Sequence, residues 1–337
     1  SEGTGAVTSE APFARILAVC PGAGAGPGPG KGDSGDAGDA ATLRLAGTLA
    51  EVQGAELTAL APVPAPSARF FDLTHDPEAV RKDLRTRAHE RLEHAVEAAL
   101  PGRSVTLEVR IGKPFLETVH SVIDGGHDLA IKAAEELDGL ARHLLASTDQ
   151  HLLRKCPATV WLHRPGAVET PRRVLAAVDV DPDPLGEPDT EAALNRRILA
   201  HAAALADWAQ APLDVLSCWE APEEGLVNVW GRGAGAENYA EAVETRQWTQ
   251  LDGLLTAAGL DKGWPKLRRH VVRGNPRSAI PRTVGELGAD LLVLGTVART
   301  GVPGLIIGNT AEDVLNSVDV GVVAVKPPGY VSPVQGS

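Results

Sequence analysis

The chain has 337 residues, 43% of them hydrophobic, and a formal net charge of −12 at pH 7. This length is sufficient for about two domains, each with a buried core. The acidic balance excludes non-specific DNA or RNA binding, because that needs basic surface to displace counterions. The apolar runs fall short of the roughly 20 residues that a membrane-spanning helix requires, so we expect neither nucleic acid nor a membrane among the partners.

The cysteines and the first residues of the chain predict a cytoplasmic protein. Cys20, Cys156 and Cys218 form no C-x-x-C pair. An odd number of widely spaced cysteines predicts reduced, mostly buried thiols. Residues 1–10 contain neither the basic segment nor the apolar core of a signal peptide.

The predicted elements alternate between strand and helix along the chain. Residues 15–19 form an apolar run that indicates a buried strand, and the Gly- and Pro-rich residues 21–35 are expected to be a surface loop. In the second half, the expected strands are residues 174–178, 213–219, 270–272, 291–294 and 321–325, and the expected helices are residues 194–209, 237–258 and 279–287. Apolar strands alternating with helices predict a parallel sheet that is covered on both faces.

The sequence contains an internal repeat that spans each half of the chain. Residues 112–114 (GKP) recur as residues 274–276 (GNP), 162 positions later, and residues 128–131 (DLAI) recur as residues 290–293 (DLLV) in the same register. A constant register over this length indicates a duplicated domain. A Pro- and Gly-containing linker then separates two domains, which we expect at residues 11–165 and 171–328.

A glycine-containing loop stands near the end of the second half. The apolar run 291–294 leads into residues 295–301 (GTVARTG), and residues 308–312 (GNTAE) open a helical pattern. A loop between a strand and a helix leaves backbone N–H groups available to an anion. Glycine also lets a ligand approach the backbone closely. The sequence therefore predicts a phosphate-binding loop here.

The spacing of Gly295, Ala298 and Gly308, followed by a small polar residue, resembles the G-x2-G-x9-G-[S/T] nucleotide loop of universal stress proteins. Ala298 departs from the second glycine of that pattern, and Asn309 departs from its Ser or Thr. The GT-x-x-RTG…IGNTAE wording looks most like the tandem, E-type branch. The resemblance covers nearly the whole chain. It implies two Rossmann-like domains, each a five-stranded parallel sheet with helices on both faces.

The resemblance also implies an ATP site in the second half, with no metal beyond the magnesium bound to the nucleotide. Asp179 would contact adenine, the backbone near Cys218 would do the same, and the triphosphate would lie over the loop. The residues so assigned are Asp179, Cys218, Gly295, Thr296, Ala298, Arg299, Gly308, Asn309 and Thr310. In an alternative interpretation, Gly295 and Gly308 serve turn geometry and helix packing, and Arg299 is a solvated or domain-contact residue.

The first half has lost this pattern. At the offset of 162, Ala133 replaces Gly295, Glu136 replaces Ala298 and Ala146 replaces Gly308. We therefore expect nucleotide in the second half alone, at most one per chain.

The two fifth strands, residues 159–163 and 320–325, would each leave an open apolar edge. Pairing them antiparallel within one chain covers both edges, so we expect an internal pseudo-dimer. Trp161 and Arg154 are expected to face outward, which leaves a homodimer open.

The expected function is stress-response regulation or ligand sensing, without catalysis, because the sequence offers no pair of general base and nucleophile. Two alternatives stay open. One is a weak ATPase or nucleotidyl-transfer enzyme on the same fold, with Asp179 or Glu312 holding a metal ion. The other is a nucleotide-free scaffold that uses the loops for packing.

Overall fold

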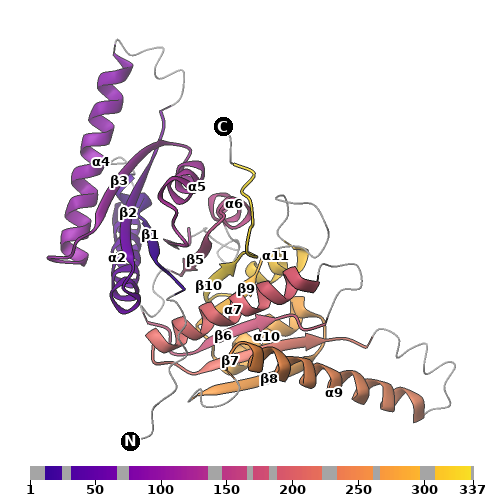
Figure 1. The fold of residues 1–337 in the computed structure, drawn as a ribbon. Coiled ribbons are helices and arrows are strands. Elements are labelled where there is room, and N and C mark those ends of the chain that lie inside the picture. The colour runs from indigo at the N-terminus through magenta and orange to yellow at the C-terminus, as the bar shows by residue number, and fades with distance from the viewer. Residues whose placement is uncertain are drawn as a thin grey trace, which may run out of the picture.

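The computed structural model describes residues 12–24, 32–66, 76–135, 146–164, 170–181, 188–221, 234–260, 266–296 and 308–334. Their strands form one ten-stranded sheet in the order β3-β2-β1-β4-β5-β10-β9-β6-β7-β8, with helices against it (Figure 1). Neighbouring strands are parallel except for β5 and β10, which are antiparallel. Elements β1 to β5 are called the first half, and β6 to β10 the second half.

The first half repeats the strand–helix alternation that the sequence predicts. Its elements are β1 (Arg15–Val19), α1 (Pro21–Gly24), α2 (Gly32–Gln53), β2 (Glu56–Pro64), α4 (Pro77–Ala99), β3 (Thr106–Gly112), α5 (Pro114–Gly125), β4 (Leu129–Ala133), α6 (Ser147–Lys155) and β5 (Thr159–His163).

The second half follows the same plan. Its elements are β6 (Val174–Val178), α7 (Pro188–Trp208), β7 (Leu213–Trp219), α9 (Ala234–Ala257), β8 (Leu267–Arg273), α10 (Pro276–Leu287), β9 (Leu291–Gly295), α11 (Asn309–Leu315) and β10 (Gly321–Val325). The predicted fold class, α/β with two Rossmann-like halves, is confirmed. The expected boundaries 11–165 and 171–328 stay a prediction.

The interior strands are apolar along their length because helices cover both faces of the sheet. In β1, Ile16 and Ala18 belong to the core under α2, α4, α7 and α9, whereas Leu17 and Val19 belong to the core under α5, α6, α10 and α11. Successive strand residues point to opposite faces, so a run such as RILAV supplies both cores.

Equivalent aspartates, one in each half, fix the start of the two halves. The amides of Ala14 and Arg15 donate to the carboxylate of Asp128, and the amides of Arg172 and Arg173 donate to that of Asp290. Asp128 and Asp290 are 162 positions apart and each precedes the fourth strand of its half. The duplication seen in the sequence is therefore present in the hydrogen bonding.

The two halves join through β5 and β10, as the sequence predicts. Trp161 pairs with Val323 in an antiparallel register. The expectation that Trp161 faces outward is wrong: its side chain is 1% exposed, and its ring meets that of Trp208 edge-on at 6.0 Å. The reason is that β5 lies in the middle of the joint sheet, where α7 of the second half covers it. Arg154 is also engaged within the chain, by Glu312 of the second half at 2.6 Å.

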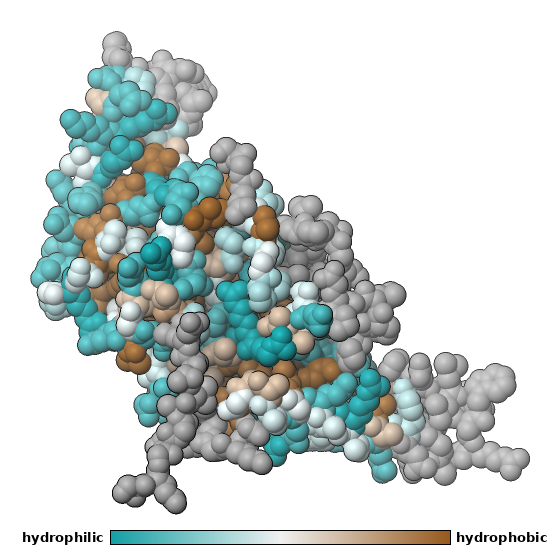
Figure 2. Space-filling model, in the orientation of Figure 1, coloured by the Kyte–Doolittle hydropathy of each residue, from teal (hydrophilic) through white to brown (hydrophobic). Residues whose placement is uncertain are grey.

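Helix α4 shows how the outer helices meet solvent. Of its 23 residues, Ala88, Leu92 and Val96 are buried, one on each successive turn. Hydrophilic residues accordingly cover much of the surface over α4 in Figure 2, with hydrophobic residues showing between them. Among the described residues, none of the helices has the length and apolar character needed to cross a membrane.

Candidate functional site

Three of the predicted ligand residues of the second half, Asp179, Cys218 and Gly295, lie at the carboxyl ends of adjacent strands, which form one edge of the sheet. Strand β6 lies between β9 and β7, and all three run parallel. Asp179 follows β6, Cys218 lies at the end of β7, and Gly295 ends β9. The carboxyl ends of parallel strands are where ligands bind in open α/β sheets. This edge is therefore the candidate site.

The backbone of Asp179 is fixed by Asn195 of α7. The Asp179 amide donates to Asn195 Oδ1 at 3.2 Å, and Asn195 Nδ2 donates to the Asp179 carbonyl at 2.5 Å. The Asp179 side chain is exposed, and its Oδ1 accepts the Asp181 amide at 3.2 Å. The carboxylate is thus presented at the surface on a backbone that cannot shift freely. Sequence reasoning missed Asn195.

The end of β7 is held by Gln247 of α9, which sequence reasoning also missed. Gln247 Nε2 donates to Ser217 Oγ at 2.8 Å and to the Cys218 carbonyl at 3.3 Å. Burial raises the pKa of the Cys218 thiol to about 11, with Arg282 acting against the shift and Glu220 adding to it. This thiol stays protonated at neutral pH and is a poor nucleophile.

Gly295 and Thr296 have packing roles in the structure. A Cβ on Gly295 would lie 2.9 Å from Leu194 Cδ2 and 3.3 Å from Ile198 Cδ1, so the glycine lets α7 lie close to β9. Thr296 is completely buried; its amide donates to the Val325 carbonyl at 3.2 Å. Close packing against α7 is the role that the alternative interpretation assigns to Gly295.

Gly308 connects the loop to α11. Its amide donates to the Thr296 carbonyl at 3.2 Å, and its carbonyl accepts the Glu312 amide at 3.0 Å. Its φ of −57° is one that any residue adopts. Thr310 lies in the first turn of α11 and is partly buried. Ala298, Arg299 and the side chain of Asn309 lie outside the described residues.

The same place in the first half holds a buried ion pair. Lys132 Nζ lies 2.8 Å from Asp149 Oδ1 and 3.4 Å from Glu135 Oε1, and Lys132 and Asp149 are 3% and 0% exposed. Asp149 Oδ2 also accepts the amide of Glu135, just after β4, at 2.8 Å. In the first half, a carboxylate of the protein itself therefore accepts the hydrogen bond that this loop amide would otherwise donate to a ligand. The counterparts in the second half, 162 positions later, are Leu294 and Ala311.

Two further groups, the buried Asp39 and the partly buried His163, lie near Lys132 of this pair. Asp39 Oδ2 accepts the Ala23 amide at 2.8 Å, and burial raises the pKa of Asp39 to about 7. His163 Nε2 lies 2.7 Å from Thr42 Oγ1, and burial lowers the pKa of His163 to about 4. At neutral pH the imidazole is uncharged.

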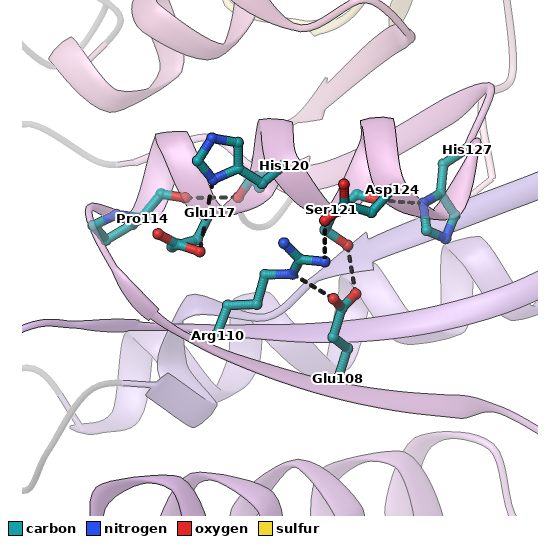
Figure 3. Close-up of polar contacts among 9 residues, drawn as sticks. Glu108, Arg110, Pro114, Glu117, His120, Ser121, Asp124 and His127 are labelled. Atoms are coloured by element: carbon teal, nitrogen blue, oxygen red, sulfur yellow. Dashed lines mark hydrogen bonds and ion pairs between the residues drawn. The ribbon is translucent and has the colours of Figure 1, made fainter. Parts of the chain in front are cut away.

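A separate polar cluster joins the edge strand β3 to α5 (Figure 3). Arg110 pairs with Glu108 and, at 2.8 Å, with Asp124, while Ser121 Oγ donates to Glu108 Oε2 at 2.5 Å. His127 Nδ1 lies 3.0 Å from the Ser121 carbonyl. These groups satisfy one another and hold β3 against α5. Among the described residues, no group of three or more His, Cys, Asp or Glu side chains is placed to hold a metal ion.

The two Rossmann-like halves share one sheet, and in the first half the carboxylate of Asp149 accepts the amide that follows β4, whereas its counterpart in the second half is Ala311. These features define a tandem α/β fold of unequal halves. The chain belongs to the universal stress protein family, whose model matches residues 32–164 and 171–326. The match covers both halves, so the resemblance seen in the loop extends to the whole repeat.

Two relatives match this chain over about three quarters or more of their own length. The chain is 28% identical to universal stress protein E of Escherichia coli K12 over 262 residues, covering 73% of this chain and 75% of that protein. It is 24% identical to the universal stress protein E homolog of Haemophilus influenzae over 280 residues, covering 76% and 84%.

Solved structures agree in fold. A protein of unknown function from Pseudomonas aeruginosa PAO1 is 26% identical, with a TM-score of 0.64 over 94% of each chain. A universal stress protein from Archaeoglobus fulgidus DSM 4304 has a TM-score of 0.61 at 16% identity, covering 93% of this chain and 98% of that one.

Proposed function

We propose that this universal stress protein is a stress-response regulator or ligand sensor that binds one adenine nucleotide, ATP with its magnesium ion, at the carboxyl edge of the second half. The observation that carries the proposal is the difference between the halves. Where the first half buries the charged pair Lys132–Asp149, the second half has the uncharged Leu294 and Ala311, so position 311 offers no carboxylate to the loop amides as Asp149 does. The anion would then come from a ligand.

Binding without turnover is part of the proposal. Glu312, one of the two carboxylates considered for a catalytic metal, accepts Arg154 Nη2 at 2.6 Å and is neutralised by it. Asp179, the other, is exposed and caps its own turn through the Asp181 amide. The Cys218 thiol, with its pKa raised to about 11 by burial, is not an activated nucleophile. All three thiols are free, which supports a reducing compartment and hence the cytoplasm.

The test is titration calorimetry of the full chain with MgATP, together with mass spectrometry of the denatured, freshly purified protein. One site per chain, lost in Asp179→Ala, is the expected result. Two equivalent sites would refute the assignment to the second half. If the chain neither binds MgATP nor carries co-purified nucleotide, the nucleotide-free scaffold is favoured. Sustained phosphate release from bound ATP, measured in the same samples, would favour the weak ATPase.

A further inference from the structure

The C-terminal strap, which we define as residues 326–334, lies along the end of α6 in the other half (Figure 1). Three successive carbonyls of α6 each accept a side chain of the strap. The pairs are Lys326 Nζ with Leu153 at 2.5 Å, Tyr330 Oη with Arg154 at 2.6 Å and Ser332 Oγ with Lys155 at 2.7 Å. The last carbonyls of a helix have no intrahelical partner, so the strap caps α6 from outside.

Lys326 also contacts the candidate site. Its Nζ donates to Thr296 Oγ1 at 2.8 Å, and the side chain is 1% exposed. Thr296 is the first residue after β9, and its carbonyl accepts the Gly308 amide. One ammonium group therefore joins α6 of the first half to the residue from which the loop departs. The aromatic ring of Tyr330, with its centroid 5.0 Å from Nζ, covers it further.

A second tie runs from α6 to the other end of the loop. Arg154 Nη2 lies 2.6 Å from Glu312 Oε1, in the first turn of α11. Arg154 and Glu312 are each about one-third exposed, at 35%. Residues 297–307 are thus bounded by two contacts with α6, at Thr296 before them and at Glu312 after them.

The hydroxyl and the ion pair that make these two ties have no equivalents at the corresponding positions of the first half. The counterparts of Thr296, Lys326, Glu312 and Arg154 at the offset of 162 are Ala134, Arg164, Gln150 and Asn316. The backbone hydrogen bond is the same in both halves, because the Ala134 amide donates to the His163 carbonyl as the Thr296 amide does to that of Val325. The hydroxyl and the charge pair are absent there. Arg164 instead donates to the Val318 carbonyl at 3.0 Å.

We propose that Lys326 and Arg154 are positioning residues for the ligand site, through which α6 of the first half holds Thr296, Gly308 and α11 in the arrangement that receives the nucleotide phosphates. This rests on the proposed function. The degenerate half then sets the affinity of the other half. Because coupling is reciprocal, nucleotide binding tightens the contact between the strap and α6.

The experiment compares MgATP affinity of the full chain in Lys326→Met, Arg154→Gln and the matched control Arg164→Met. Arg164 is the internal counterpart of Lys326 and also bonds a carbonyl of the opposite half, but its bond does not reach Thr296. Hydrogen bonds to charged groups hold one conformation strongly, so Lys326→Met should weaken binding roughly tenfold, and Arg164→Met less than about twofold.

Hydrogen exchange without nucleotide gives a second readout. The amides of Thr296 and Gly308 should exchange faster in Lys326→Met and Arg154→Gln than in Arg164→Met. If Lys326→Met does not fold, the partly exposed Arg154→Gln decides. A wild-type chain that binds no nucleotide refutes the proposed function. A wild-type chain that binds, with variants equal to it in affinity and exchange, refutes the positioning role alone.

Discussion

Replacing Lys132 by Met should destabilise the first half, because it leaves a carboxylate buried without its cation. Burial alone would lower the pKa of Lys132, but the carboxylates of Asp149 and Glu135 outweigh it and hold that pKa above its ordinary value. The Lys132 ammonium is therefore charged at neutral pH. Removing one partner of a buried pair costs about 3–5 kcal/mol. Asp149 keeps the Glu135 amide, so we expect about 3 kcal/mol.

The assay is urea unfolding of the full chain at pH 7.5, followed by circular dichroism. The single variants Lys132→Met and Asp149→Leu and their double variant complete a cycle. Apolar replacement of both partners is often neutral, so the double variant should be within about 2 kcal/mol of the parent.

Two results would refute this reasoning. Additive losses in the double variant would mean that the two side chains act independently. A loss of under about 1 kcal/mol in Lys132→Met would mean that water reaches Asp149, as it does at surface pairs. Either result would also weaken the contrast between the two halves on which the proposed function rests.

Three further predictions concern pH, the loop and the seam. The pKa of Asp39 is raised from 3.8 to about 7, so the stability that its protonated form contributes is lost as pH rises through that window. Relative to the parent, the free energy of unfolding of Asp39→Asn should therefore rise by up to ~4 kcal/mol between pH 4 and 8. A difference in thermal unfolding that does not depend on pH would contradict this. Gly308→Val should fold, because φ is −57°, yet lose MgATP binding in calorimetry; unchanged affinity would leave the glycine a structural role. Separately expressed halves should self-associate through β5 or β10, whereas stable monomers in ultracentrifugation would argue against a needed seam.

Most of the fold could be predicted from the sequence because the interior strands are apolar on both faces. Edges and helix starts carried less signal. The strand expected at residues 270–272 is Leu267–Arg273, because this edge strand exposes Arg268 and Arg269 and keeps an apolar pattern only in its middle. Of residues 21–35, expected to be a surface loop, Pro21–Gly24 form the short helix α1, residues 32–35 begin α2, and the rest lie outside the described residues. Leu43 and Leu49 are buried in the later turns of α2 and stabilise its glycine-rich start.

The candidate site could be predicted only in outline. Parallel strands bring Asp179, Cys218 and Gly295 to one edge, and that follows from the order of elements. The side chains that hold this edge do not, because an isolated polar residue such as Asn195 or Gln247 on a helix gives no sign of which backbone group it meets. Ala298 and Arg299 stay predictions.

The antiparallel seam has a consequence for synthesis at the ribosome. Strand β5 leaves the ribosome about 160 residues before β10, and the end of α6 awaits the still later strap. At roughly 5–20 residues per second, the nascent first half carries an uncovered apolar edge for about 8–30 s. Trp161, which α7 later covers, is exposed in that interval. The edge of β5 is therefore covered only once the second half of the same chain has been synthesised and has paired β10 with it.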